Sequence, residues 1–91
     1  MSSASSRYEI ELSEVAKKEL AGLEDKVQLR VRLAFSLLSS NPRPPRAIKL
    51  QGNRGYRVRV GDYRIVYEVF DKKVLVLVLR IGHRREVYRK P

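Results

Sequence analysis

The segment GYRVRVGDYRIVYEV, which begins at Gly55, constrains the fold more than any other part of the chain. Apolar and polar residues alternate on both sides of its central Gly-Asp dipeptide, as they do in two strands joined by a two-residue turn. Such a turn sets the pairing register, so that Val58 lies opposite Ile65 and Arg59 lies opposite Arg64. We therefore predict an antiparallel hairpin that is buried on one face.

This register gives the two faces of the hairpin different chemistry. The buried face carries apolar and aromatic side chains: Tyr56, Val58, Val60, Tyr63, Ile65 and Tyr67. The other face carries Arg57, Arg59 and Arg64, and like charges directly opposite each other destabilise a sheet. One explanation for these like charges is that solvent and salt screen the repulsion between them on an exposed face. We favour the other explanation, which is that the three guanidinium groups form an anion site.

The residues before the hairpin predict one strand and two helices. YEIEL, residues 8–12, alternates like a strand. Ser13 is suited to cap a first helix, which Gly22 weakens at its end. Asp25 and Gln28 resemble a capping box that opens a second helix. One buried stripe is expected on that helix: Val27, Val31, Ala34, Phe35 and Leu38. The prolines of SSNPRPPR stop it.

The remaining segments complete a sheet. AIKL, residues 47–50, predicts a strand, and VLVLVLRI, residues 74–81, is apolar on both faces and suits an interior strand. The sequence leaves open whether the turn at DKK has two or three loop residues. A three-residue loop would place Arg80 near Arg64, whereas a two-residue loop would place Arg80 on the helix side or at a frayed strand end. The predicted fold is α+β, with an N-terminal strand and a helical hairpin packed on an antiparallel sheet. Residues 1–6 are expected to be a flexible tail and residues 7–91 one domain.

The charge distribution predicts a polyanionic partner. The formal net charge is +10, and residues 1–42 are neutral, so the whole excess lies in residues 43–91. Arginine, which outnumbers lysine there by ten to four, matches phosphate oxygens in pairs. The chain has no cysteine, one histidine and no carboxylate cluster, so we expect no metal site and no cofactor. No segment suits a secretory signal or a membrane span, and we expect a cytoplasmic protein without membrane association.

The C-terminal segment GHRREVYR adds groups that handle protons and phosphate. His83 supplies an imidazole, the side chain that most often moves protons in proteins. Tyr88 could move a proton only if neighbouring arginines lowered its pKa from the usual value of about 10. Arg84 and Arg85 extend the phosphate-binding set, which Arg80 joins on one of its placements. This set suits RNA cleavage by the RNA's own 2′-hydroxyl, with arginines stabilising the pentavalent phosphate. The ordinary alternatives are a surface histidine and a packing tyrosine.

The block YRVRVGDYRIVYEVFDKKVLVLVLRIGHRREVY, together with the order strand, helical hairpin and meander, resembles the RelE branch of the RelE/ParE toxin superfamily. The resemblance implies a toxin that enters the ribosomal A site, cuts the messenger RNA there and is neutralised by an acidic RelB-like antitoxin in a hetero-oligomer. It also implies that Arg64 binds phosphate, that Arg84 belongs to the catalytic set, and that Tyr88 stacks on the substrate nucleotide or takes part in the chemistry.

One departure from the family pattern affects the chemistry. Arg57 and Arg59 stand where the best-studied RelE has two lysines, and arginine binds phosphate but stays protonated. Two alternatives to the ribonuclease remain. ParE-type relatives share the fold but target DNA gyrase, and they generally lack the arginine and tyrosine set. An inactive nucleic-acid-binding or antitoxin-binding module of the same fold is the other alternative.

Overall fold

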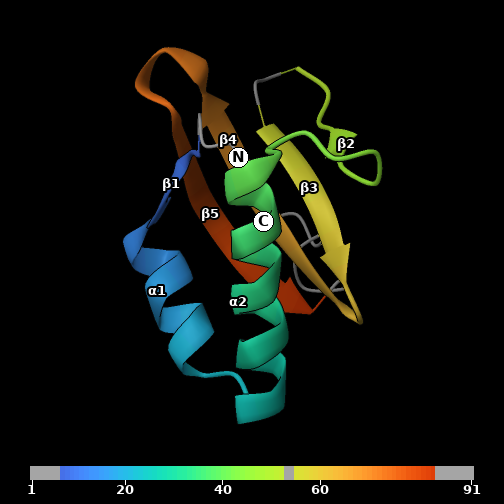
Figure 1. The fold of residues 1–91 in the computed structure, drawn as a ribbon. Helices are drawn as coiled ribbons and strands as arrows, with labels where there is room; N and C mark the ends of the chain where they lie inside the picture. The colour runs from blue at the N-terminus through green and yellow to red at the C-terminus, as the bar shows by residue number, and fades with distance from the viewer. Residues whose placement is uncertain (1–6, 53–54, 84–91) are drawn as a thin grey trace.

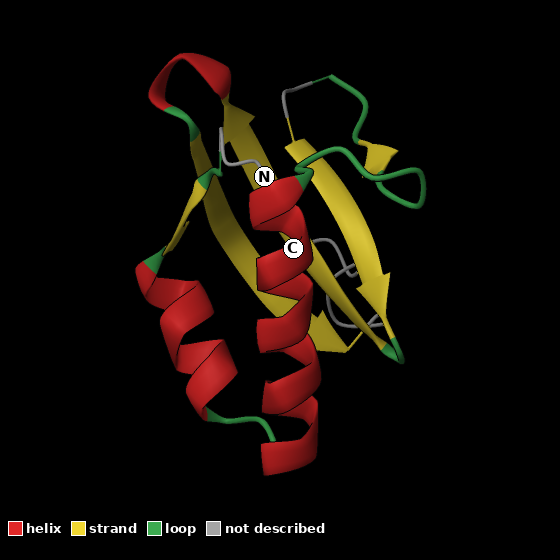
Figure 2. Ribbon diagram, in the orientation of Figure 1, coloured by secondary structure: helices red, strands yellow, loops and turns green. Residues whose placement is uncertain are grey.

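The sheet has five strands, and both helices cover one of its faces (Figures 1 and 2). The structure is a computed structural model that describes residues 7–52 and 55–83. The strand order is β1-β5-β4-β3-β2. The elements follow the chain as β1 (Glu9–Leu12), α1 (Glu14–Ala21), α2 (Asp25–Ser40), β2 (Ile48–Lys49), β3 (Gly55–Val60), β4 (Tyr63–Phe70), the 3₁₀ turn η1 (Asp71–Lys73) and β5 (Leu75–His83). The predicted α+β fold class is confirmed.

The sheet is antiparallel from β2 to β5, as expected, but β1 joins it in the parallel sense. β1 pairs with β5, with Ile10 beside Val76 and Leu12 beside Val78. The helical hairpin carries the chain away from β1. The meander then ends in β5, which runs beside β1 in the same direction. β5 therefore lies between two strands, which agrees with its apolar residues on both faces.

The predicted cap of the first helix is confirmed, whereas the capping box predicted for the second helix is wrong. The Ser13 hydroxyl accepts a hydrogen bond from the Ala16 amide at 3.0 Å and donates one to the Leu79 carbonyl at 2.9 Å. In the second helix Asp25 is already helical, and the extended Glu24 precedes it without a side-chain cap. The side-chain amide of Gln28 instead donates to the Leu23 carbonyl at 3.3 Å. No capping box forms, because Asp25 lies inside the helix and not at the extended cap position that precedes it.

The register predicted for the hairpin is confirmed at every pair. Arg59 pairs with Arg64 and Val58 pairs with Ile65. Gly61 has a φ of +61°, the left-handed conformation that such a turn requires. The correct register places the apolar face of the hairpin toward the helices and the arginine face on the other side of the sheet.

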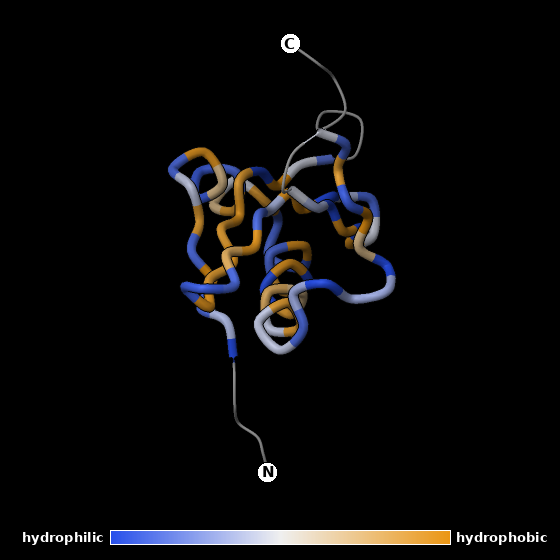
Figure 3. The backbone as a smooth tube through the Cα atoms, turned by 90° about the horizontal axis from the view of Figure 1, so that it is seen from above, coloured by the Kyte–Doolittle hydropathy of each residue, from blue (hydrophilic) through white to orange (hydrophobic). Residues whose placement is uncertain are grey.

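The core lies between the helices and the sheet, where the hydrophobic stretches of strands and helices run alongside each other (Figure 3). The fully buried apolar residues come from α1, α2 and the central strands: Ala16, Val31, Ile65, Tyr67, Val76 and Val78. Tyr67 is the largest of these, and its hydroxyl donates to the Pro42 carbonyl at 2.8 Å. Among the residues of the described ranges, no helix is long and apolar enough to cross a membrane.

Candidate functional site

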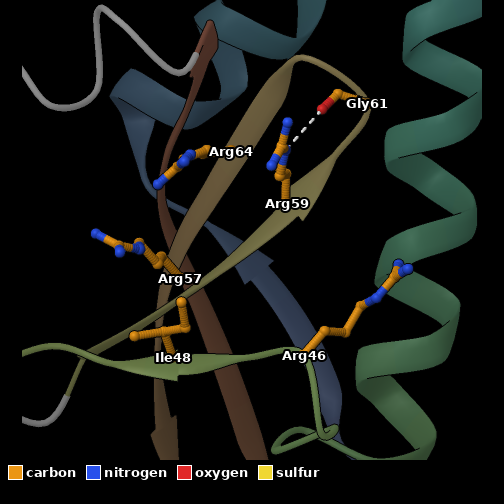
Figure 4. Close-up of a pocket in the computed structure, with 6 residues that line it drawn as sticks. All are labelled: Arg46, Ile48, Arg57, Arg59, Gly61 and Arg64. Carbon is orange, nitrogen blue, oxygen red and sulfur yellow. Dashed lines mark hydrogen bonds between the residues drawn. The ribbon is translucent and has the colours of Figure 1, made fainter.

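A hollow of about 450 Å³ lies on the sheet side of the molecule, and we call it the arginine hollow (Figure 4). It is lined by Arg46, Ile48, Arg57, Arg59, Gly61 and Arg64. Four of these six residues are arginines, and none of the six is acidic. The three arginines that the hairpin register brought together therefore do share one site.

Strand pairing builds most of this site. Arg59 on β3 lies directly opposite Arg64 on β4, and Arg57 follows on the same face of β3 because side chains alternate along a strand. Arg57 and Arg64 are half-buried, whereas Arg59 is exposed. The Nε of Arg59 donates to the Gly61 carbonyl at 3.2 Å, which holds this guanidinium beside the hairpin turn.

The fourth arginine, Arg46, was not among the predicted site residues. It is brought to the hollow by β2, where Ile48 pairs with Arg57. Arg46 lies two positions before Ile48, and Figure 4 shows both side chains coming from the β2 side of the hollow. The two-residue β2 carries too little pattern to fix its register with β3, so no signal in the sequence placed Arg46 at the hollow.

Arg80 lies outside the arginine hollow, and neither predicted length of the turn before it is correct. Phe70 pairs with Leu75, so the turn spans the four residues 71–74. A register shift follows, in which Val66 pairs with Arg80 while Tyr67 pairs with Val78. The guanidinium of Arg80 binds Glu19 of α1, with an Nη2–Oε2 distance of 2.8 Å. The other carboxylate oxygen of Glu19 accepts from the Ile81 amide at 2.6 Å. This ion pair draws Arg80 toward α1.

The other predicted site residues lie at or beyond the end of β5. His83 pairs with Tyr63 across the strands, and their rings meet edge to face at a centroid distance of 5.6 Å. His83 does not line the arginine hollow. His83 lies two positions after Ile81 on β5, so the alternation of side chains places His83 on the helix side of the sheet. Arg84, Arg85 and Tyr88 lie outside the described residues.

A second polar cluster, which sequence reasoning missed, ties the chain together at the other end of β3. Arg43 makes two hydrogen bonds to the Asp71 carboxylate, at 3.1 and 2.8 Å, and its Nε donates to the Tyr56 hydroxyl at 2.9 Å. The Tyr8 hydroxyl donates to the same carboxylate at 2.7 Å. The hydrogen bonds from Arg43 and then from Tyr8 lower the pKa of Asp71. This cluster joins β1, the loop after α2 and the β4–β5 turn, so its role is structural.

The arginine hollow is suited to binding phosphate but not to moving protons. Guanidinium groups stay protonated and present paired donors to phosphate oxygens. The lining holds no histidine, carboxylate, tyrosine or lysine. Within the part of the chain that the structure describes, no three metal-ligating side chains gather. Any proton transfer must therefore come from groups outside the lining.

Comparisons with known proteins agree with this geometry. The family model for the ParE toxin of the type II toxin-antitoxin system parDE matches residues 10–88. Toxin RelG of Mycobacterium tuberculosis is 28% identical over 85 residues, covering 91% of this chain and 98% of its own. RelE in the archaeal RelE-RelB complex from Pyrococcus horikoshii superposes with a TM-score of 0.77 at 28% identity, covering 86% of this chain and 96% of that chain.

The isolated RelE toxin of E. coli superposes with a TM-score of 0.75 at 30% identity, covering 84% of this chain and 83% of that one. The similarity thus extends over both the helical hairpin and the meander, and it includes the strands that form the arginine hollow. The chain belongs to the RelE branch of the RelE/ParE family of type II toxin-antitoxin toxins.

Proposed function

We propose that this toxin is a ribosome-dependent endoribonuclease that cuts messenger RNA in the A site and so inhibits translation. The observation that carries the proposal is the arginine hollow, in which Arg59 and Arg64 are paired directly across two strands and Arg46 and Arg57 line the same space. Four guanidinium groups around one hollow present paired donors to the oxygens of a phosphate.

In this reaction the RNA's own 2′-oxygen attacks the adjacent phosphorus. The bond from phosphorus to the 5′-oxygen of the next nucleotide breaks, leaving a 2′,3′-cyclic phosphate and a free 5′-hydroxyl. The charge that builds up on the pentavalent phosphate is stabilised by preorganised donors. Arg57, Arg59 and Arg64 supply these donors, and Arg46, in the segment before β2, adds a fourth guanidinium to the lining.

Two protons have to move in that reaction, one from the 2′-hydroxyl and one to the leaving 5′-oxygen. The arginines of the hollow cannot supply this exchange. We propose that Tyr88 does, since His83 lies on the helix side of the sheet, and that Arg84 and Arg85 complete the phosphate contacts. Tyr88 would act as stacking partner or proton carrier for the nucleotide at the scissile bond. The reaction needs no metal ion or cofactor.

An acidic antitoxin is the proposed partner. Relatives of this chain crystallised as RelE-RelB complexes, among them the archaeal complex from Pyrococcus horikoshii. A chain with a net charge of +10 favours a partner of opposite charge. We propose that this toxin likewise forms a hetero-oligomer with a RelB-like antitoxin, and that its place of action is the cytoplasm, where the ribosomes are.

The test is to map messenger RNA ends in a translating extract after adding the purified toxin. We expect Arg64→Ala to reduce cleavage by about 10²–10³-fold, the range found when one transition-state donor is removed. Arg84→Ala and Tyr88→Phe are expected to lose cleavage as well. Arg32→Ala is the matched control, because Arg32 is exposed on α2 and lines no part of the hollow. Unchanged cleavage by Arg64→Ala, Arg84→Ala and Tyr88→Phe would contradict the assignment.

A gyrase inhibitor is the second candidate, favoured by one specific observation. The family model that matches residues 10–88 is the one for ParE toxins. On this alternative the toxin blocks supercoiling by purified DNA gyrase and leaves messenger RNA intact. Supercoiling assays run beside the cleavage assay separate the two candidates, because each predicts one positive and one negative result.

A further inference from the structure

A second hollow, of about 580 Å³, lies between β2 and the turn η1, and we call it the lysine hollow. It is larger than the arginine hollow, whose volume is about 450 Å³. Lysines line it from both sides, Lys49 from β2 and Lys72 and Lys73 from η1. Tyr56 and Phe70 add two aromatic rings to the lining. The proposed reaction leaves this surface without a role.

The charge of the lysine hollow is positive, because the carboxylate in its lining is neutralised by a neighbour. Asp71 and Arg43 both line the hollow and form an ion pair, and the same carboxylate accepts a hydrogen bond from the Tyr8 hydroxyl. The other charged groups of the lining are the ammonium groups of the three lysines. All three lysines are exposed, so a ligand from solution can reach them. A ligand of this hollow therefore carries negative charge.

Two of the ammonium groups lie over aromatic rings. The Nζ of Lys49 is 5.6 Å from the centroid of the Tyr56 ring, and the Nζ of Lys73 is 5.8 Å from the centroid of the Phe70 ring. A cation within about 6 Å of a ring centroid is attracted to the face of the ring. These contacts hold the ammonium groups at the wall of the hollow. Basic side chains beside aromatic rings are the combination by which proteins bind single-stranded nucleic acid.

Strand β2 joins the lysine hollow to the arginine hollow. Ile48 pairs with Arg57 and Lys49 pairs with Tyr56, and neighbouring side chains on a strand point to opposite faces. Ile48 accordingly lines the arginine hollow, whereas Lys49 lines the lysine hollow. β2 is the outermost strand of the described sheet, and both of its residues are exposed. A flexible strand of RNA that enters one hollow can therefore pass around β2 to the other.

We propose that the lysine hollow binds phosphates of the same RNA strand whose scissile phosphate lies in the arginine hollow. The inference rests on the proposed function and adds a second contact site for its substrate. Lys49, Lys72 and Lys73 would bind backbone phosphates some nucleotides away from the scissile bond. Because an ammonium group is a point charge that needs no particular orientation of the phosphate, these contacts do not select a base sequence.

The link through β2 favours RNA over the other anions that lysines can bind. A free nucleotide or an inorganic oligophosphate carries its few charges at one place and gains nothing from a second site across β2. An acidic peptide also carries negative charge, but the two aromatic rings suit nucleobases, which stack on aromatic rings whatever their sequence. An RNA strand has one phosphate per nucleotide, so a single strand supplies charges to both hollows.

The test compares a short RNA with a long one. The probes are fluorescein-labelled oligonucleotides of about four and about twelve nucleotides, which lie within the range of known single-strand binding sites. Their 2′-oxygens are methylated, so the toxin cannot cut them. Fluorescence anisotropy gives the dissociation constant of each probe at several salt concentrations. For single strands, the logarithm of the binding constant falls with the logarithm of the salt concentration by about 0.7 per phosphate contact.

Lys49→Gln and Lys73→Gln each remove one charge at an exposed position. We expect each variant to reduce the salt slope of the long RNA by about 0.7, and the double variant to reduce it by about 1.4. Binding of the short RNA should stay unchanged, because the four arginines bind it in their own hollow. Lys26→Gln is the matched control, since Lys26 is exposed on α2 and lines neither hollow. Circular dichroism checks that all variants fold.

The inference is overturned if the double variant binds the long RNA with the same dissociation constant and salt slope as Lys26→Gln. It is overturned equally if the short RNA loses as much affinity as the long one, since the lysines would then act only through the general field of the protein. If the double variant loses binding of inorganic triphosphate or of an acidic antitoxin, and not of RNA, the hollow belongs to that ligand instead. Failure of the proposed function has a different signature, since the wild-type toxin would then leave messenger RNA intact in a translating extract while the lysines still strengthen binding of the long RNA.

Discussion

Replacing Arg59 by glutamine is expected to make the free toxin more stable while impairing its phosphate site. Arg59 faces Arg64 across the hairpin and shares the hollow with Arg57 and Arg46. Like-charge pairs of this kind cost about 0.2–1 kcal/mol each at low ionic strength, so the three neighbours together cost about 1–2 kcal/mol. The substitution also loses the 3.2 Å hydrogen bond to the Gly61 carbonyl. Because this bond is exposed, its contribution to stability lies at the lower end of about 0.5–1.5 kcal/mol.

The net gain in the free energy of unfolding is therefore about 0.5–1 kcal/mol, or a rise in Tm of about 2–8 °C for a chain of this length. Thermal unfolding followed by circular dichroism measures it at low salt and at high salt. At ~0.5 M salt the Debye length falls to about 4 Å, so the gain should disappear. Arg32→Gln removes the same charge from α2 and is expected to change stability by less than about 0.5 kcal/mol.

Inorganic phosphate provides a second measurement on the same samples. A ligand that binds only the folded state raises its stability in proportion to the logarithm of its concentration over Kd. Phosphate should therefore raise the Tm of the wild-type toxin more than that of Arg59→Gln. If Arg59→Gln instead unfolds earlier than the wild type by the same margin at low and at high salt, the arginines of the hollow do not repel one another, and our explanation of the site is wrong.

Two further predictions concern the core and the second polar cluster. Tyr67→Phe should cost about 1 kcal/mol at neutral pH, because the buried hydrogen bond to Pro42 is lost. Burial raises the pKa of Tyr67 to about 12, so its stabilising contribution is complete below pH 10 and is lost as the pH rises toward 12; alkaline unfolding should be less steep in the variant. Arg43 and Tyr8 lower the pKa of Asp71, so the stability that this carboxylate adds is present above its ordinary pKa of about 4 and is lost as the pH falls below it. When the free energy of unfolding is measured as the pH is lowered, Asp71→Asn should lack this loss of stability. If the variant loses stability at acid pH as the wild type does, the contribution of Asp71 is excluded.

The parts of the site that could be predicted are those that local pairing determines. A two-residue turn with glycine in the left-handed conformation leaves a single register, and that register alone brought Arg59 opposite Arg64. Arg46 was not predicted at the site because β2 is only two residues long. The pairing of such a short strand depends on the rest of the sheet and not on the sequence of the strand.

The placement of Arg80 depends on contacts between distant segments. Glu19 lies 61 residues before Arg80, yet its carboxylate binds both the Arg80 guanidinium and the Ile81 amide beside the irregular pairing of β4 and β5. No pattern within β5 encodes a partner on α1. The capping-box motif at Asp25 also misleads, because Asp25 lies inside α2 and the extended Glu24 takes the cap position.

The parallel pairing of β1 with β5 also bears on how the toxin is made. Leu12 needs Val78 as its neighbour, and the Ser13 hydroxyl needs the Leu79 carbonyl, so the first strand of the chain is held by the last strand of the described sheet. Contacts of such long sequence separation form late, after local elements such as the β3–β4 hairpin. Of these five strands, the one that emerges first from a translating ribosome is therefore the last to be placed, and the sheet is complete only once β5 has been synthesised.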